Sequence, residues 1–279
     1  MNILNIKSSK RRSSGVDRGV IYVTDDRAFP GLQISVTSHD APTCVIDIGM
    51  TPEQLQWCEH NNIHIQTYTD ITPDTHMWQT WIKPLALKLS PFKTTLYIDT
   101  DTIVCNDLSC VFDVIEHRGL LVVKDEGKYI QEPNITNYQV KHGPCESYVY
   151  NYVNAGVIGY TRQYMWFIEQ YADTCIQCFN QNEFDIFSWY DEGCLNRCLD
   201  LNDCVQACDD YRFNRLSPVI PCLTKHKLLI SDVEANVHKK YNYLMSFTSY
   251  DSFMRNKNIN NNNYILHFRG TSKPWNHWL

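Results

Sequence analysis

A short apolar run that ends in two acids constrains the fold of this chain more than any other feature. The run reads Leu96-Tyr-Ile-Asp-Thr-Asp-Thr102, and its apolar part predicts a buried strand. Every second side chain of a strand points to the same face, so Asp99 and Asp101 share a face at the strand's carboxyl end. Two carboxylates placed in this way can bind one divalent cation. The same pattern is also typical of a solvated turn, and other segments must decide between the two interpretations.

Strand-like and helix-like segments alternate along the chain. Strands are predicted over residues 19–24, 43–48, 119–123, 152–160 and 264–268, and helices over 74–89, 163–180 and 191–199. A further helix begins at Thr51-Pro52-Glu53, a capping hydroxyl followed by proline and negative charge, and ends at Asn61-Asn62. This order predicts an α/β fold with a mostly parallel central sheet flanked by helices. Such a sheet binds ligands beyond the carboxyl ends of its strands, where the two acids lie.

Length and charge exclude some classes of protein. The chain has 279 residues, of which 43% are hydrophobic, enough for one large domain with its own core. Its net charge of −6 argues against a nucleic-acid partner, because phosphate backbones need a basic face. The basic cluster Lys10-Arg11-Arg12 lies among serines and is predicted to be a solvated terminus. We therefore predict a basic, Ser-rich N-terminal segment over residues 1–18 and a single domain over residues 19–279.

Hydropathy and cysteine content predict a cytoplasmic protein with reduced thiols. No apolar stretch is long enough to span a membrane, and the N-terminus lacks the apolar core of a signal peptide. Twelve cysteines in a long chain without an export signal favour free thiols over a disulfide framework. A zinc site is the alternative for some of them, although their spacing also fits neighbours on half-buried helix faces. These cysteines are Cys175, Cys178, Cys194, Cys198, Cys204 and Cys208.

Five segments, taken in order, resemble the family 8 glycosyltransferases, which include glycogenin. The segments are residues 20–26, 99–101, 153–157, 191–196 and 267–275, so the similarity runs from about Gly19 to the C-terminus. Each motif alone is weak, but chance rarely reproduces the ordered set. The resemblance implies a GT-A fold, a nucleotide-sugar donor that is usually a UDP-sugar, and a Mn²⁺ ion, with Mg²⁺ as the alternative.

The resemblance also implies the metal ligands and the diphosphate contacts. Asp99, Asp101 and His267 match the family's three metal ligands, and this mixture of oxygen and nitrogen donors suits Mn²⁺. Taken alone, His267 reads as a core histidine at the end of a buried strand. Gly270 permits close approach of the backbone to the diphosphate, and Lys273 adds a positive charge.

Further positions match family residues that contact the donor. They are Thr24, Asp25 and Asp26 for uridine and ribose, Lys83 for the diphosphate or sugar, and Asn154, Ala155 and Asp191 for the transferred sugar. Each has a simpler alternative. Two acids after a strand often form a turn, a lysine is usually on the surface, and Asp191 can cap a helix.

Glu192 departs from the family, which usually has glutamine there, close to the reacting carbon of the sugar. A carboxylate at this point can stabilise positive charge on the sugar, attack it, or deprotonate an acceptor hydroxyl. We therefore expect catalytic roles for Glu192 and Asp191. The family precedent is retention of configuration, whereas a carboxylate base is what inversion needs. The alternative is that Glu192 supports only the first turn of a helix.

The resulting hypothesis is a metal-dependent transferase that moves glucose, galactose or xylose from a UDP-sugar to a hydroxyl of a glycan or glycoprotein. Because the sequence ends at Leu279, without a basic aromatic tail for a membrane surface, we expect a soluble acceptor. Such an enzyme would also suit a large DNA virus that glycosylates its capsid protein in the host cytoplasm. The first alternative is a non-catalytic module that binds nucleotides or sugars. A nucleotidyltransferase is the second, but residues 15–26 lack its glycine- and basic-rich loop.

Overall fold

The computed structural model describes residues 17–69, 79–104, 107–124, 153–180, 191–200, 202 and 265–267. The strands are β1 (Arg18–Thr24), β2 (Thr43–Asp47), β3 (His64–Thr67), β4 (Thr94–Ile98), β5 (Thr102–Val104), β6 (Leu120–Lys124), β7 (Val153–Thr161) and β8 (Ile265–His267). The helices are α1 (Phe29–Val36), α2 (Pro52–His60), α3 (Gln79–Leu87), α4 (Ser109–Arg118), α7 (Met165–Asn180) and α8 (Asp191–Asp200), with a 3-10 helix, η2 (Arg162–Tyr164), before α7. Among the helices of these described segments, none is long and apolar enough to cross a membrane.

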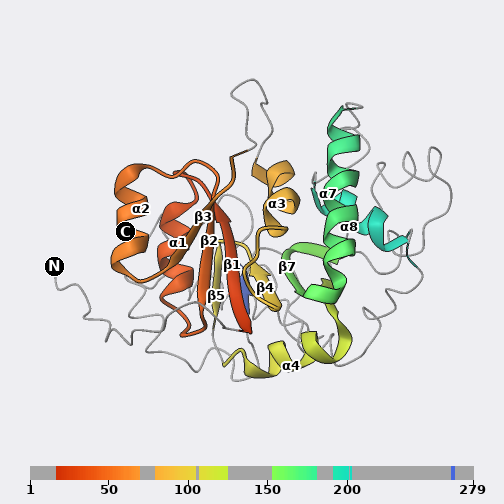
Figure 1. The fold of residues 1–279 in the computed structure, drawn as a ribbon, viewed down its shortest axis with the longest axis horizontal. Helices are drawn as coiled ribbons and strands as arrows, with labels where there is room; N and C mark the ends of the chain where they lie inside the picture. Colours follow the sequence, from red (N-terminus) through yellow and green to blue (C-terminus); the bar gives the residue numbers. More distant parts are fainter. Residues whose placement is uncertain are drawn as a thin grey trace, which may run out of the picture.

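Six strands form the central sheet in the order β3-β2-β1-β4-β7-β6, and β5 pairs with β8 in a separate ladder (Figure 1). The pairs β1–β2, β2–β3 and β1–β4 are parallel, whereas β7 runs antiparallel to both of its neighbours. The prediction of a mostly parallel sheet flanked by helices is confirmed. After β3 the chain returns to the other side of β1 to form β4. Parallel sheets open a ligand crevice where the strand order reverses in this way, between the carboxyl ends of β1 and β4.

Alternate side chains of the strands form two cores, one on each face of the sheet. Ile21 and Tyr97 belong to the core that includes residues of α3, α7 and α8. Val20 and Leu96, their neighbours along the strands, belong to the core that includes residues of α1, α2 and α4. The chain therefore forms three layers, helices on both faces of one sheet.

Most predicted elements are present within a few residues of their expected bounds. At the start of α2, the Thr51 hydroxyl accepts from the backbone N–H of Gln54 at 3.4 Å and the Gln54 side chain accepts from the Thr51 N–H at 2.9 Å, a capping box. The prediction that a helix begins at Thr51 is confirmed. Residues 74–78 of the predicted helix over 74–89 lie outside the described residues, as does most of the segment after residue 200.

The described residues contain four elements that were not predicted from the sequence, namely α1, β3, α4 and β5. Helix α1 contains proline and glycine in its first turn. Its N-cap residue, Ala28, makes no side-chain hydrogen bond to the helix backbone. Its start is instead stabilised by Asp25, whose Oδ1 accepts from the N–H groups of Arg27 and Ala28, at 3.0 Å each. Strand β3 has only four residues, two of them exposed, which leaves little apolar pattern to detect.

Candidate functional site

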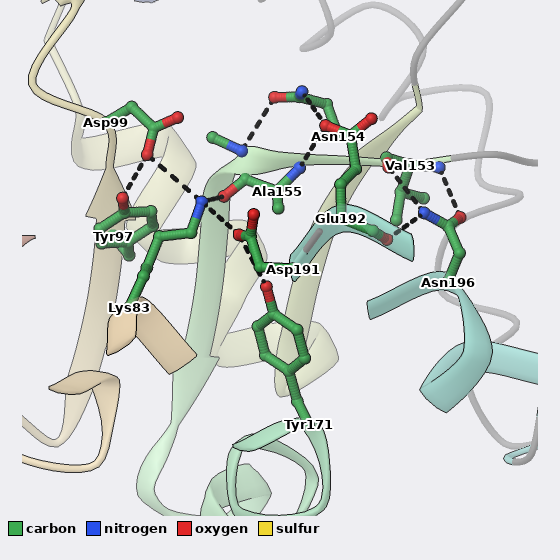
Figure 2. A network of polar contacts seen from close by, with 11 residues as sticks. Lys83, Tyr97, Asp99, Val153, Asn154, Ala155, Tyr171, Asp191, Glu192 and Asn196 are labelled. Carbon is green, nitrogen blue, oxygen red and sulfur yellow. Dashed lines mark hydrogen bonds and ion pairs between the residues drawn. The ribbon is translucent and has the colours of Figure 1, made fainter. Parts of the chain in front are cut away.

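Four elements bring polar side chains together at the carboxyl end of β4 (Figure 2). Lys83 comes from α3, Asp99 directly follows β4, Asn154 and Ala155 lie in β7, and Asp191 and Glu192 form the first turn of α8. These residues come from separate parts of the sequence between positions 83 and 192, and the predicted donor and metal residues among them lie in one network. This is the edge of the sheet where a ligand crevice is expected from the strand order.

Lys83 is the centre of the network. Its Nζ lies 2.6 Å from Asp191 Oδ2 and 3.5 Å from Asp99 Oδ1, and it donates to the carbonyl of Ala155 at 3.2 Å. Burial lowers the pKa of Lys83, but the charges of Asp191 and Asp99 outweigh that effect and hold the pKa above its usual value. The ammonium is therefore charged although its side chain is only 10% exposed. The alternative interpretation, a surface lysine, is wrong, because α3 turns this side chain toward the two acids.

Two tyrosines complete the ion cluster. Tyr97 donates its hydroxyl hydrogen bond to Asp99 Oδ1, and Tyr171, from α7, donates to Asp191 Oδ2 at 3.1 Å. Burial, together with the nearby carboxylates, raises the pKa of both phenols well above the usual value. Both therefore stay protonated and serve as donors. Burial also raises the pKa of Asp191, an effect that the Lys83 ammonium opposes.

An irregularity in β7 shapes the other side of the site. The pairing of β7 with β6 shifts between Val122, which faces Ile158, and Val123, which faces Asn154. Residues 155–157 therefore lack regular partners in β6, and such bulges redirect side chains at functional sites. Asn154 Oδ1 folds back to accept from the Gly156 N–H at 2.9 Å, and the Gly156 carbonyl accepts from the Asp99 N–H at 2.9 Å. The bulge thus fixes the backbone of Asp99.

Glu192 is held in place by β7 rather than exposed to solvent. Its Oε2 accepts from Asn154 Nδ2 at 2.5 Å and from the Ala155 N–H at 3.4 Å. With 9% of its surface exposed, the residue is at the inner wall of the site. Two donors on one carboxylate oxygen stabilise the charged form in a fixed orientation.

Asn196 holds α8 against β7, a role that the sequence analysis missed. Its side-chain amide accepts from the Val153 N–H at 2.8 Å and donates to the Val153 carbonyl at 2.9 Å, as a neighbouring strand would. The same amide nitrogen also donates to the Glu192 carbonyl at 2.8 Å. Tyr97 and Tyr171 were missed as well. A buried asparagine or tyrosine in an apolar pattern reads as core, and only the contact partners distinguish it from a site residue.

Asp101 and His267 lie next to this cluster. Asp101 is half-buried in the turn before β5, and its charge contributes to the raised pKa of Tyr97. In the ladder of β5 with β8 the backbone of His267 pairs with that of Thr102, the residue after Asp101. The three expected metal ligands are therefore close along the backbone, although the His267 side chain lies outside the described atoms.

The charge of the site fits a divalent cation. Asp99, with 27% of its side chain exposed, is reachable, whereas Asp191 is 5% exposed. The described carboxylates around Lys83 outnumber its single ammonium, and a cation would offset the excess negative charge. Carboxylates with an imidazole suit Mn²⁺. Within the part of the chain that the structure describes, no three acidic, histidine or cysteine side chains are already grouped for a metal.

The acids after β1 have local partners. Asp25 accepts from the backbone of Arg27 and Ala28, and its Oδ2 lies 3.0 Å from the guanidinium of Arg27. Thr24 is fully buried, and its hydroxyl donates to the Asp25 carbonyl at 3.2 Å. Asp26 is exposed. These contacts form a turn, the alternative interpretation of this segment, and a contact with a nucleoside stays a prediction.

The remaining predicted residues give a mixed picture. Gly270 and Lys273 lie outside the described residues, as do Cys204 and Cys208. The other four cysteines of the possible zinc site are buried. Burial raises the pKa of Cys175 to about 11 and that of Cys198 to about 12, so both thiols are protonated. Protonated thiols that pack in a helix interface are typical of a core.

Comparisons with known proteins identify the family. The model of glycosyl transferase family 8 matches residues 58–279. The galactosyltransferase LgtC, solved with donor and acceptor sugar analogues, is similar in fold, with a TM-score of 0.59, 18% identity, and coverage of 93% of this chain and 91% of LgtC. An active-site Gln-to-Glu mutant of LgtC matches with a TM-score of 0.53, 15% identity, and coverage of 92% and 89%.

The apo form of the glycosyltransferase GlyE from Streptococcus pneumoniae TIGR4 matches with a TM-score of 0.55 and 14% identity, over 94% of this chain and 57% of GlyE. None of the curated proteins matches the chain significantly. At these identities the solved structures establish the fold, which is that of GT-A glycosyltransferases. The family model covers most of the sequence, including every element from α3 onward, and the chain therefore belongs to glycosyl transferase family 8.

Proposed function

We propose that this protein is a Mn²⁺-dependent glycosyltransferase that moves a hexose or pentose from a UDP-sugar to a hydroxyl of a glycan or glycoprotein. The observation that carries the proposal is the convergence of Asp99, Asp191 and Glu192 on one buried network around Lys83, beyond the carboxyl end of β4. A structural core alone does not need three carboxylates at a ligand crevice, since burying charge costs free energy.

Different residues of the chain bind the metal ion, the sugar, the nucleoside and the diphosphate in this proposal. Asp99, Asp101 and His267 hold the ion, and a divalent cation there supplies positive charge against the departing diphosphate. Lys83 fixes the carboxylates of Asp99 and Asp191 relative to each other, rather than contacting the donor freely. Asn154 and Asp191 hydrogen-bond the transferred sugar, while Thr24, Asp25 and Asp26 flank the nucleoside. Gly270 and Lys273 hold the diphosphate.

Glu192 faces the reacting carbon of the sugar in this proposal. In the reaction the bond from that carbon to the diphosphate oxygen breaks, a bond to the acceptor oxygen forms, and the acceptor loses its proton. A fixed carboxylate stabilises the positive charge that develops on the sugar. One of the similar structures is of LgtC with an active-site glutamine changed to glutamate, and this chain has glutamate where the family resemblance leads us to expect glutamine. We favour retention of configuration, in line with the family.

Donor binding tests the proposal. Thermal unfolding is followed with UDP-glucose, UDP-galactose and UDP-xylose, each with Mn²⁺ and with EDTA. A true donor at a hundredfold excess over its Kd should stabilise the fold by about 2.7 kcal/mol, and only with Mn²⁺. Asp101→Asn should abolish the shift. The matched control Asp113→Asn removes an exposed acid that pairs with Arg18 at the amino end of β1, and should keep it. No shift with any UDP-sugar would contradict the proposal.

A further inference from the structure

A line of hydrogen-bonded side chains connects α1 to the turn that carries Asp99. The Tyr22 hydroxyl lies 2.9 Å from His39 Nε2 and 2.9 Å from Ser35 Oγ. Ser35 Oγ lies 2.9 Å from Thr102 Oγ1, which donates to the backbone carbonyl of Asp99 at 2.7 Å. From His39 the line runs through Tyr22 of β1 and Ser35 of α1 to Thr102 of β5, on the face of the sheet that α1 covers, and α1 packs against β5.

The two ends of this line fix the direction of every hydrogen bond in it. A carbonyl only accepts, so the Thr102 hydroxyl donates its one proton to the Asp99 carbonyl. It must therefore accept from Ser35. Ser35 must then accept from Tyr22, and Tyr22 from a protonated Nε2 of His39. At the other end, His39 Nδ1 accepts from the Ala41 N–H at 3.2 Å, which requires the same neutral tautomer.

Three members of the line are buried and His39 is half-buried, so the members depend on one another. Tyr22 and Ser35 have no exposed surface and Thr102 has 1%. A hydroxyl that loses its donor or acceptor there has no bulk water to replace it. Burial lowers the pKa of His39 to about 4, which keeps the ring neutral near pH 7. Removing any one hydrogen bond of the line therefore disturbs the hydrogen bond to the Asp99 carbonyl.

The end of the line is where the site needs a fixed backbone. The Asp99 N–H is held by Gly156 and its carbonyl by Thr102. Thr102 also belongs to the backbone pairing that places His267 opposite it. Thr102 thus connects the turn that carries both acids, through its hydroxyl, with the strand that carries the third expected ligand, through its backbone.

We infer that Tyr22, Ser35 and His39 are positioning residues, which hold the turn of Asp99 and Asp101 in the conformation that binds a divalent cation. The inference rests on the proposed function. All three are linked to the turn through Thr102 and the Asp99 carbonyl. They act through the Asp99 carbonyl, and removing such outer partners of a metal site typically weakens metal binding by about 10–100-fold.

The test measures Mn²⁺ affinity by isothermal titration in the presence of UDP, together with the free energy of unfolding. Tyr22→Phe and Ser35→Ala break the line at different links, and each should weaken Mn²⁺ binding roughly tenfold. Tyr160→Phe is the matched control, because the Tyr160 hydroxyl donates a buried hydrogen bond to the Leu87 carbonyl, away from this line. It should lose comparable stability and keep the wild-type Mn²⁺ affinity.

Two histidine variants separate hydrogen bonding from packing. Gln can place an amide N–H where His39 Nε2 lies, so His39→Gln should bind Mn²⁺ nearly as the wild type does, whereas His39→Leu should behave like Tyr22→Phe. Wild-type affinity in Tyr22→Phe and Ser35→Ala, or an equal loss in Tyr160→Phe, would overturn the inference alone. A wild-type protein that binds no Mn²⁺ with UDP would overturn the proposed function as well.

Discussion

The acids at the ends of β1 and β2 and the acids around Lys83 are held in different ways. After β1 and β2, Asp25 and Asp47 each accept from the backbone N–H groups two and three residues further along the chain. Around Lys83, by contrast, Asp191 and Glu192 take their partners from α3, α7 and β7. The first group is satisfied by its own turns. The second forms only when distant elements have packed together.

This difference separates supporting acids from chemical ones. A carboxylate that accepts from the backbone amides of its own turn fixes that turn first of all. Carboxylates held by a buried ammonium or by donors from other elements keep their charge in a fixed geometry, the arrangement that electrostatic catalysis uses. We therefore expect substitutions to cost little at the first group and much at the second.

Breaking the ion cluster should have the largest effect. Lys83→Met leaves Asp191 buried without its counter-charge and should cost about 3–5 kcal/mol of unfolding free energy, measured by urea denaturation. The double variant Lys83→Met/Asp191→Asn should regain part of this loss. Lys93→Met is the control, since Lys93 forms an exposed pair with Asp17, and should leave stability unchanged. Equal, small effects of the two lysine variants would contradict a buried ion cluster.

Glu192→Gln tests the chemical role of the second group. Gln keeps the size of Glu and an oxygen that can accept from Asn154 and Ala155, but it carries no charge. Turnover should fall by about a hundredfold, or about 2.7 kcal/mol, while UDP binding with Mn²⁺ persists. Near-native turnover would mean that hydrogen bonding alone matters at this position. The product anomer, read by NMR, tests retention at the same time.

Acid should weaken the fold through His39, on the α1 side. Its pKa is about 4 in the folded chain and about 6.5 when unfolded, so the unfolded state binds the proton first. Stability therefore falls as the pH drops from 6.5 toward 4, by on the order of 1–2 kcal/mol at pH 5. His39→Gln does not titrate, and its unfolding free energy relative to wild type should improve over this range. A difference that is independent of pH would contradict the buried neutral ring.

The smallest effect is expected at Asp25. Asp25→Asn keeps an oxygen for the Arg27 and Ala28 amides and loses only the charge pair with the Arg27 guanidinium, which is 76% exposed. Such exposed pairs contribute about 0–1 kcal/mol. Asp25→Ala also removes the oxygen and should cost about 0.5–2 kcal/mol. If Asn and Ala cost the same in thermal unfolding, the carboxylate does not support the turn as described.

The same contrast explains what could be predicted from the sequence. The strand before Asp99 and the cap at Thr51 were predicted because a few consecutive residues determine them. Lys83 was placed in the donor site only by the family resemblance. No residue near it in the sequence indicates its partners Ala155 and Asp191, which lie more than 70 residues away. The bulge in β7 and the hydrogen bonds between Asn196 and Val153 depend on packing, which the hydrophobic periodicity of the sequence does not predict.

The most direct test of the account is catalysis itself, measured as release of UDP from UDP-glucose, UDP-galactose and UDP-xylose with a panel of hydroxyl acceptors. We predict that the wild-type protein and Asp113→Asn release UDP in Mn²⁺ with at least one donor, and that EDTA or Asp101→Asn abolishes the release. Release that persists unchanged in Asp101→Asn or in EDTA would contradict the assignment of the site. Tight binding of UDP-sugars without any release would show a binding module in place of a transferase.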